Sequence, residues 1–290
     1  MTSKKNAGSP ADPPARRALS ARELSGELQH GQSRDLLHAL HLLTPAGDLN
    51  ADARRKLKQI NHFIGLLRPA LFDVLDQSEP ATVVDAGTGN GYLGLLVYEL
   101  LVGPATAGTV IGLEVNAELV AKARKRAQRL GFDRMEFVEG AVAEFTRPLT
   151  NLAVVALHAC DTATDDAIAL GLRQQAKVIA VVPCCQAEVA RSFNAARTNE
   201  PLGPLWRHPI QRREFASHIT NVIRALLLES HGYQVTVTEL VGWEHSLKNE
   251  LIVARKFQRG NAQARSQLYA LIQQFPQLRM GLLDAMTPTA

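Results

Sequence analysis

Residues 82–94, which read TVVDAGTGNGYLG, constrain the fold of this chain more than any other segment. The segment opens with Val83 and Val84, β-branched residues that are typical of a buried parallel strand. Three alternating glycines follow, namely Gly87, Gly89 and Gly91. Because glycine has no Cβ, these positions permit a tight turn and a close approach to a ligand. The apolar residues from Tyr92 onwards predict a helix, so the order is strand, glycine turn, helix.

This glycine turn is compatible with two classes of nucleoside cofactor and with an ordinary strand-to-helix loop. Gly89, Gly91 and Gly94 satisfy the G-x-G-x-x-G spacing of a dinucleotide fold. Asp85 argues against a dinucleotide, because a carboxylate at the end of the strand repels a pyrophosphate. The same carboxylate attracts the ammonium group of a methionine moiety. The charge therefore favours S-adenosylmethionine (SAM).

A second acid ends the next apolar strand. In TVIGLEVN, residues 109–116, Glu114 is placed to accept hydrogen bonds from ribose hydroxyls, as an acid does in nucleoside-binding folds. Glu114 thus supports a nucleoside without separating the two cofactor classes. The sequence predicts a cofactor site made of the following residues: Asp85, Gly87, Gly89, Gly91, Tyr92, Glu114, Glu139 and Ala141.

Composition predicts a soluble, cytoplasmic protein. The chain has 290 residues, of which 46% are hydrophobic, as in ordinary globular proteins. Three cysteines cannot form a disulfide framework, and the first residues lack an apolar signal region. No apolar run reaches the roughly 20 residues that span a bilayer, so we expect no membrane partner. The net charge of +4 suits a polyanionic partner.

The chain divides into four predicted segments. They are a disordered basic tail (1–20), an N-terminal helical extension (21–78), a catalytic domain (79–257) and a C-terminal helical segment (258–290). The extension contains an amphipathic helix that starts near Asn50 and that Pro69 kinks or ends. Because this helix directly precedes the first strand, we expect it to cover the cofactor pocket. Its polar side carries Lys56, Lys58 and Gln59, and the alternative for the lysines is an ordinary solvated face.

Strands and helices alternate through the catalytic domain and predict a parallel α/β sheet. The last two strands, near 234–240 and 250–254, are joined by a connection too short for a crossover and must be antiparallel. A parallel sheet that ends in an antiparallel hairpin is the architecture of class I methyltransferases. We therefore expect an α/β fold with a Rossmann-like, seven-stranded sheet, a terminal antiparallel hairpin and an N-terminal helical extension.

Reactive side chains follow two neighbouring strands of this sheet. LHACDTATD, after the strand at 151–158, contains His158, Cys160 and Asp161, and VVPCCQ, after the strand at 177–182, contains Cys184 and Cys185. Ligands of open α/β sheets bind beyond the carboxyl ends of the strands. We therefore expect these five residues to line the site of the methyl acceptor.

Four interpretations of this group stay open. In the first, a cysteine thiolate attacks carbon 6 of a pyrimidine and thereby activates carbon 5 as the methyl acceptor. In the second, His158 and the cysteines bind zinc. In the third, the cysteines are small buried residues that shape the pocket floor, which is the commonest behaviour of free cysteine. Finally, Asp161 or His158 acts as a general base for a substrate hydroxyl, since methyl transfer needs mainly alignment and a lone pair.

The segment between Gln186 and Phe215 is rich in arginine and contains one tryptophan. It predicts a surface that grips phosphates and stacks on a base, with a solvated lid as the alternative. Near the end of the chain, Lys248 and Glu250 share one face of a strand. The predicted substrate-binding residues are Lys58, Trp206, Arg212, Arg213 and Lys248.

DAGTGNGYLG, LHACDTATD and PCCQ together resemble the class I methyltransferase family that includes tRNA 2′-O-methyltransferases with a CHHC zinc finger. The matching residues are His158, Cys160, Ala163, Thr164, Asp165, Cys184 and Cys185. The resemblance covers about 55–256 and implies a SAM-dependent methyltransferase acting on tRNA-like RNA. Asp161 replaces a glycine of that family, Gln186 replaces a histidine, and no Cys/His cluster precedes the domain.

The resemblance also bears on adenine binding. Ala141 stands where many methyltransferases carry an aspartate for the adenine amino group, so we expect backbone contacts there. The alternative functions are a small-molecule or protein methyltransferase, or a non-catalytic RNA-binding module of the same fold.

Overall fold

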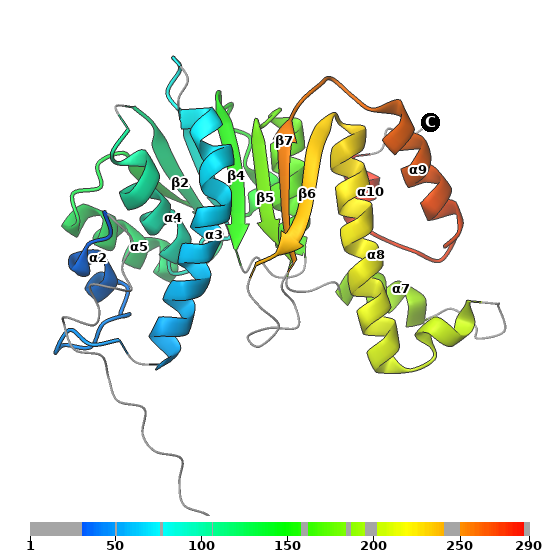
Figure 1. Cartoon of the computed structure of the whole chain (residues 1–290), viewed down its shortest axis with the longest axis horizontal. Coiled ribbons are helices and arrows are strands. Elements are labelled where there is room, and N and C mark those ends of the chain that lie inside the picture. The colour runs from blue at the N-terminus through cyan, green and yellow to red at the C-terminus, as the bar shows by residue number, and fades with distance from the viewer. Residues whose placement is uncertain are drawn as a thin grey trace, which may run out of the picture.

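The computed structural model describes residues 31–49, 51–75, 78–105, 107–157, 162–183, 187–194, 202–240 and 250–286. These residues form one seven-stranded sheet with helices packed against it (Figure 1). Alternate residues of a strand contribute to two separate cores: Val83 packs in the core that contains α3, and Val84 in the core that contains α6 and α8. No helix of the described part is both long and apolar enough to cross a bilayer.

The sheet has the order β3-β2-β1-β4-β5-β7-β6. Its strands are β1 (Thr82–Ala86), β2 (Thr109–Glu114), β3 (Met135–Glu139), β4 (Leu152–Leu157), β5 (Val178–Val182), β6 (Tyr233–Glu239) and β7 (Glu250–Lys256). The first five strands are parallel, whereas β7 is antiparallel to both β5 and β6. The predicted seven-stranded sheet and its terminal hairpin are confirmed. Because β7 runs backwards, it begins at the edge where β4 and β5 end.

The helices of the described residues are α2 (Arg34–Ala39), α3 (Ala51–Leu75), α4 (Tyr92–Val97), α5 (Ala117–Arg129), α6 (Thr162–Arg173), α7 (Ala187–Asn194), α8 (Pro209–Ser230), α9 (Ala262–Gln273) and α10 (Gly281–Met286). A π-helical turn, η1 (Tyr98–Val102), continues α4. Single 3₁₀ turns are η2 (Val142–Glu144) and η3 (Gly203–Trp206).

Two helices differ from the sequence expectation. The helix α3 does not end at Pro69 but continues to Leu75, because residues beyond the proline, including Leu71 and Val74, are buried against the sheet. Packing of an amphipathic face therefore outweighs the lost backbone hydrogen bond. The helix α8 begins five residues before the expected Glu214, at Pro209, which suits the first position of a helix.

A buried polar network ties α6, α8 and β7 together at the carboxyl edge of the sheet. Arg224 on α8 is 1% exposed, and its Nε donates to the Asp165 carboxylate at 2.7 Å. Its Nη1 donates to Asn221 Oδ1 at 2.9 Å, and the amide nitrogen of Asn221 donates to Glu250 at the start of β7. The network fixes the first turn of α6 and the first residue of β7 to one helix.

This network generates a prediction about stability. We expect Arg224→Met to lower the free energy of unfolding by about 3–5 kcal/mol, because it leaves the buried Asp165 carboxylate without its partner. The double variant Asp165→Asn/Arg224→Met removes the uncompensated charge and should recover most of that loss. Urea denaturation measures both. Equal stability of the single and double variants would contradict a buried ion pair.

Candidate active site

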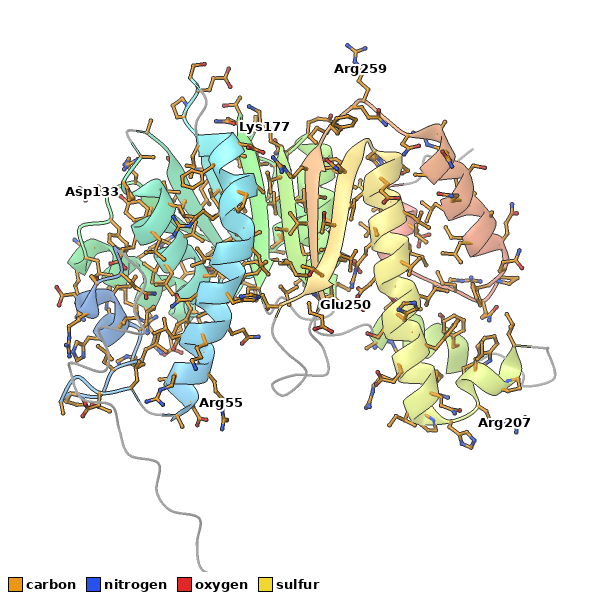
Figure 2. All side chains as sticks on the ribbon, in the orientation of Figure 1. Arg55, Asp133, Lys177, Arg207, Glu250 and Arg259 are labelled. Carbon is orange, nitrogen blue, oxygen red and sulfur yellow. The ribbon has the colours of Figure 1, made fainter. Side chains whose placement is uncertain are left out.

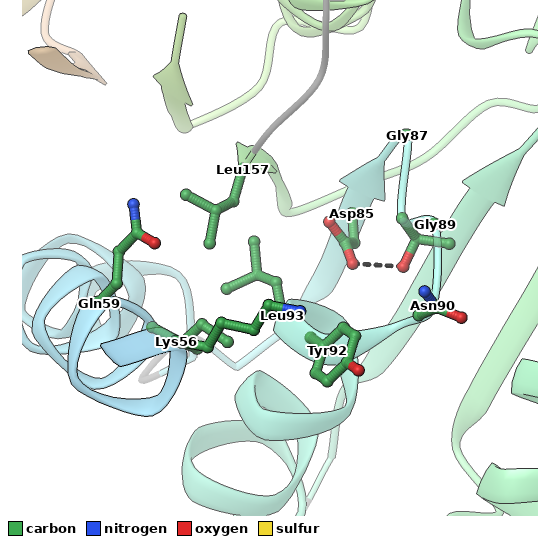
Figure 3. Close-up of a pocket in the computed structure, with 11 residues that line it drawn as sticks. Lys56, Gln59, Asp85, Gly87, Gly89, Asn90, Tyr92, Leu93 and Leu157 are labelled. Carbon is green, nitrogen blue, oxygen red and sulfur yellow. Dashed lines mark hydrogen bonds between the residues drawn. The ribbon is translucent and has the colours of Figure 1, made fainter. Parts of the chain in front are cut away.

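A cavity of about 210 Å³ lies where the carboxyl end of β1 meets the first turn of α4. Figure 3 shows side chains of α3 facing the glycine loop across this cavity. The residues that line it come from α3, the loop after β1, the start of α4 and the end of β4: Lys56, Gln59, Ile60, Asp85, Gly87, Thr88, Gly89, Asn90, Tyr92, Leu93 and Leu157. The expectation that α3 covers the pocket agrees with this lining.

The loop between β1 and α4 has a backbone that favours glycine. Gly87, Gly89 and Gly91 have φ angles of 69°, 56° and 78°, in the left-handed region. At Gly91 a Cβ would also lie 3.3 Å from Leu95 Cδ1, whereas a Cβ at Gly89 would meet no atom within 4 Å. The glycines are therefore needed first for the turn itself, and Gly89 leaves open space beside the cavity.

The Asp85 side chain fixes the start of α4 through hydrogen bonds. Its carboxylate is buried, and Oδ2 accepts hydrogen bonds from the Thr88 hydroxyl and from the Gly94 backbone N–H at 3.0 Å. The second bond satisfies a donor that the first turn of a helix leaves unpaired. A Cβ at Gly94 would lie 2.9 Å from Oδ2, so glycine permits this approach. A carboxylate thus occupies the position where a dinucleotide fold binds a pyrophosphate.

Burial raises the pKa of Asp85 to about 6. Loss of solvation is the largest cause, and the nearby charge of Glu114 adds to it, while the hydrogen bonds from Thr88 and Gly94 lower the pKa. The carboxyl group is therefore mostly ionised at pH 7 and mostly protonated at pH 5. A cationic ligand in the cavity would favour the ionised form.

Glu114 fixes the glycine loop to the end of β2. Its Oε2 accepts a hydrogen bond from the Gly89 N–H at 2.9 Å, and its Oε1 accepts one from the Asn116 N–H at 3.0 Å. Each carboxylate oxygen keeps further acceptor capacity for a ribose hydroxyl. Glu114 pairs in register with Glu139 on β3, and Ala141 follows, so these residues share the carboxyl edge.

Of the predicted cofactor residues, the structure brings four to the cavity wall: Asp85, Gly87, Gly89 and Tyr92. The others lie beneath it or along the neighbouring strand ends: Gly91, Glu114, Glu139 and Ala141. Sequence reasoning did not assign the remaining wall residues to the site: Ile60, Thr88, Asn90, Leu93 and Leu157. Thr88 and Asn90 lie between the glycines, and Leu157 ends the apolar strand β4. Their positions in the sequence are the one feature from which a place at the cavity could have been predicted.

The predicted acceptor residues His158, Cys160, Asp161, Cys184 and Cys185, like Lys248, lie outside the described residues. The described strands nevertheless fix where these segments begin. Leu157, which lines the cavity, pairs in register with Val182 on β5. The chain therefore enters both predicted segments from adjacent strand ends, beside the cavity.

On the predicted substrate side, Trp206 needs correction, whereas Lys58 stays a candidate for contacts with a substrate. Lys58 is exposed and does not line the cavity, because positions 56, 59 and 60 share the helix face that does. Trp206 is 2% exposed and stacks on Phe193, with 5.2 Å between ring centroids. Further ring contacts join it to Phe215 and Phe275. Trp206 therefore belongs to an aromatic core and cannot stack on a base.

Arg212 and Arg213 lie near the start of α8. Arg213 is exposed and its Nε lies 3.4 Å from Glu214 Oε1, a solvent-exposed contact of small energetic weight. Arg212 is half-buried. Both remain candidates for contacts with a substrate.

Comparison with known proteins assigns the domain. Residues 55–192 match the family model Methyltransf_32, described as a methyltransferase domain. This region is therefore similar to a methyltransferase domain. It contains most of α3, β1 to β5 and most of α7, and with them every residue of the cavity wall. The match supports a methyltransferase and is consistent with SAM as its cofactor.

Curated relatives share a longer stretch of the chain. Proteins named glutathione S-transferase C-terminal domain-containing protein match from Bos taurus (27% identical over 233 residues) and Mus musculus (28% over 234 residues). Each match covers 71% of this chain and 34% of the relative. The chain thus spans about a third of the length of these relatives.

Solved structures of similar fold include two methyltransferases bound to S-adenosylhomocysteine (SAH). An O-methyltransferase from Bacillus cereus is 15% identical with a TM-score of 0.47, covering 80% of this chain and 96% of that chain. A Podospora anserina methyltransferase is 15% identical with a TM-score of 0.45, covering 87% and 100% respectively.

The pKa of Asp85 predicts a pH dependence of SAM binding. The ionised fraction falls as the pH drops through about 6, so the attraction for the methionine ammonium falls with it. We expect the affinity measured by calorimetry to decrease about tenfold from pH 7 to pH 5. Asp85→Asn should bind SAM weakly at both pH values. Glu114→Gln should keep a pH dependence but shift it to lower pH, because the charge of Glu114 helps to raise the pKa of Asp85. An affinity independent of pH in the unaltered protein would exclude Asp85 as the ammonium partner.

Proposed function

We propose that this methyltransferase transfers the methyl group of SAM to RNA, with a tRNA-like molecule as the first candidate. The observation that carries the proposal is a basic rim on both sides of the carboxyl edge of the sheet. Figure 2 shows Arg55 on α3 and Arg207 before α8 on opposite sides of this edge, with Glu250 between them. A polyanion lying across the edge would contact both sides.

Each side of the rim carries exposed cations. On α3 these are Arg55 and Lys58, and around the start of α8 they are Arg207 and Arg213. Arg55 contacts Asp52 at 3.3 Å, but both side chains are largely exposed, so this pair gives way readily to a phosphate. Phosphate contacts from such groups supply sequence-independent affinity for nucleic acid.

In this proposal the cofactor lies along the strand ends. Asp85 holds the methionine ammonium, Glu114 holds the ribose, and the backbone near Ala141 contacts the adenine. SAM supplies an electrophilic methyl group on its sulfonium. The protein's main contribution to the rate is to align that methyl group with a lone pair of the acceptor atom in a site that excludes bulk water.

The acceptor side is proposed from the sequence. His158 or Asp161 would take the proton from an acceptor hydroxyl, in keeping with the resemblance to tRNA 2′-O-methyltransferases. Cys160, Cys184 and Cys185 would shape the floor, with covalent catalysis on a pyrimidine as the alternative. Lys248, next to β7, would contribute to substrate binding at the same edge. We place the activity in the cytoplasm, where thiols stay reduced.

The test of the proposal follows the methyl group. Methyl-tritiated SAM is incubated with the protein and a lysate from cells that lack it, and label is counted separately in RNA, protein and small molecules. We expect label in RNA. Arg212→Ala/Arg213→Ala should reduce the labelling and make it less sensitive to salt, by about one unit of slope per lost phosphate contact.

A matched control variant removes the same number of positive charges at a site away from the rim. Arg259→Ala/Arg265→Ala removes two exposed arginines near the start of α9, at the opposite edge, where Figure 2 shows Arg259. This variant should label RNA as the unaltered protein does. Label in the small-molecule or protein fraction would show that the substrate belongs to that class and not to RNA. RNA binding without label in any fraction would indicate a non-catalytic module.

A further inference from the structure

We propose that Lys56 binds the carboxylate of the methionine moiety of SAM, so that the cavity recognises both charges of the amino acid. The inference rests on the proposed cofactor site and adds a residue to it. Of the eleven described residues that line the cavity, Lys56 is the one cation and Asp85 the one anion. An amino acid is a zwitterion, and a cavity with one charge of each sign is complementary to it.

The position of the ammonium group supports this assignment. Lys56 Nζ lies 5.4 Å from the centroid of the Tyr92 ring, at the start of α4. Figure 3 shows the Lys56 side chain reaching from α3 towards Leu93 and Tyr92, across from the strand end that carries Asp85. A cation–π contact of this kind holds the ammonium at the cavity while leaving its N–H donors available to a carboxylate.

The helix periodicity of α3 explains why Lys56 is the lysine at the cavity. Positions 56, 59 and 60 lie three and four residues apart and therefore share one face, and all three line the cavity. Gln59 adds a neutral amide donor on the same face. Lys58 is exposed on another face. The chain thus offers a second lysine, two residues away, as a matched control.

The sign of the charges predicts which end of the amino acid each residue holds. Asp85 is buried at the end of β1, so the ammonium enters more deeply. Lys56 is exposed at the mouth, so the carboxylate stays near solvent. The contribution of Lys56 should then be moderate and should decrease as salt is added, because exposed charges are screened.

The test compares two ligands that differ only in this carboxylate, SAM and decarboxylated SAM. Calorimetry is run on the unaltered protein, Lys56→Met and Lys58→Met. We expect Lys56→Met to weaken SAM about tenfold, the effect of one solvent-exposed charge-assisted hydrogen bond, and to leave decarboxylated SAM within about twofold. Lys58→Met should change neither affinity.

Two results would overturn the inference. One is that Lys56→Met weakens both ligands equally, which would assign Lys56 to the shape of the cavity. The other is that it weakens neither. Failure of the proposed cofactor site gives a separate result, because the unaltered protein would then bind neither SAM nor its decarboxylated form. Failure of RNA as the substrate class would leave both affinities as expected here. Circular dichroism of the three proteins should be superimposable, since neither lysine is buried.

Discussion

The buried carboxylate of Asp85 is the group on which the cofactor side of this protein depends. It lies near the end of the interior strand β1, 2% exposed, and accepts hydrogen bonds from Thr88 and Gly94. One carboxylate thereby fixes the glycine loop, satisfies the first turn of α4 and requires glycine at position 94. Its negative charge also selects the ligand, because it disfavours a pyrophosphate and favours an ammonium group.

The acceptor side is held by a different interaction at the same edge. Asp165, Arg224, Asn221 and Glu250 form one hydrogen-bonded chain across α6, α8 and β7. Asp165 stands in the first turn of α6 and Glu250 opens β7, so each marks the return of the chain from a predicted acceptor segment to regular structure. In the proposed function, Asp85 and Glu114 supply the cofactor half of the sheet edge, and this hydrogen-bonded chain anchors the frame of the acceptor half.

The topology of the sheet could be predicted because it depends on the order of strands and helices along the chain, which the apolar pattern of nearby residues indicates. Alternating apolar strands and helices specify a parallel sheet, and the short connection before Glu250 specifies a hairpin. What the sequence could not provide depends on contacts between distant residues. Trp206 is buried because Phe193 and Phe275 lie beside it, and Phe275 is far away in the chain. The choice of Lys56 over Lys58 likewise depends on how α3 is rotated against the sheet, which its polar side alone does not determine.

The most direct measurement of the central claim is a crystal structure of the protein with SAH. The account predicts the ligand's ammonium within hydrogen-bonding distance of Asp85, its ribose at Glu114, and its carboxylate towards α3. The sulfur should point to the end of β4 at Leu157. A ligand whose amino-acid end turns away from Asp85, or one bound outside the cavity between α3 and the glycine loop, would contradict the account.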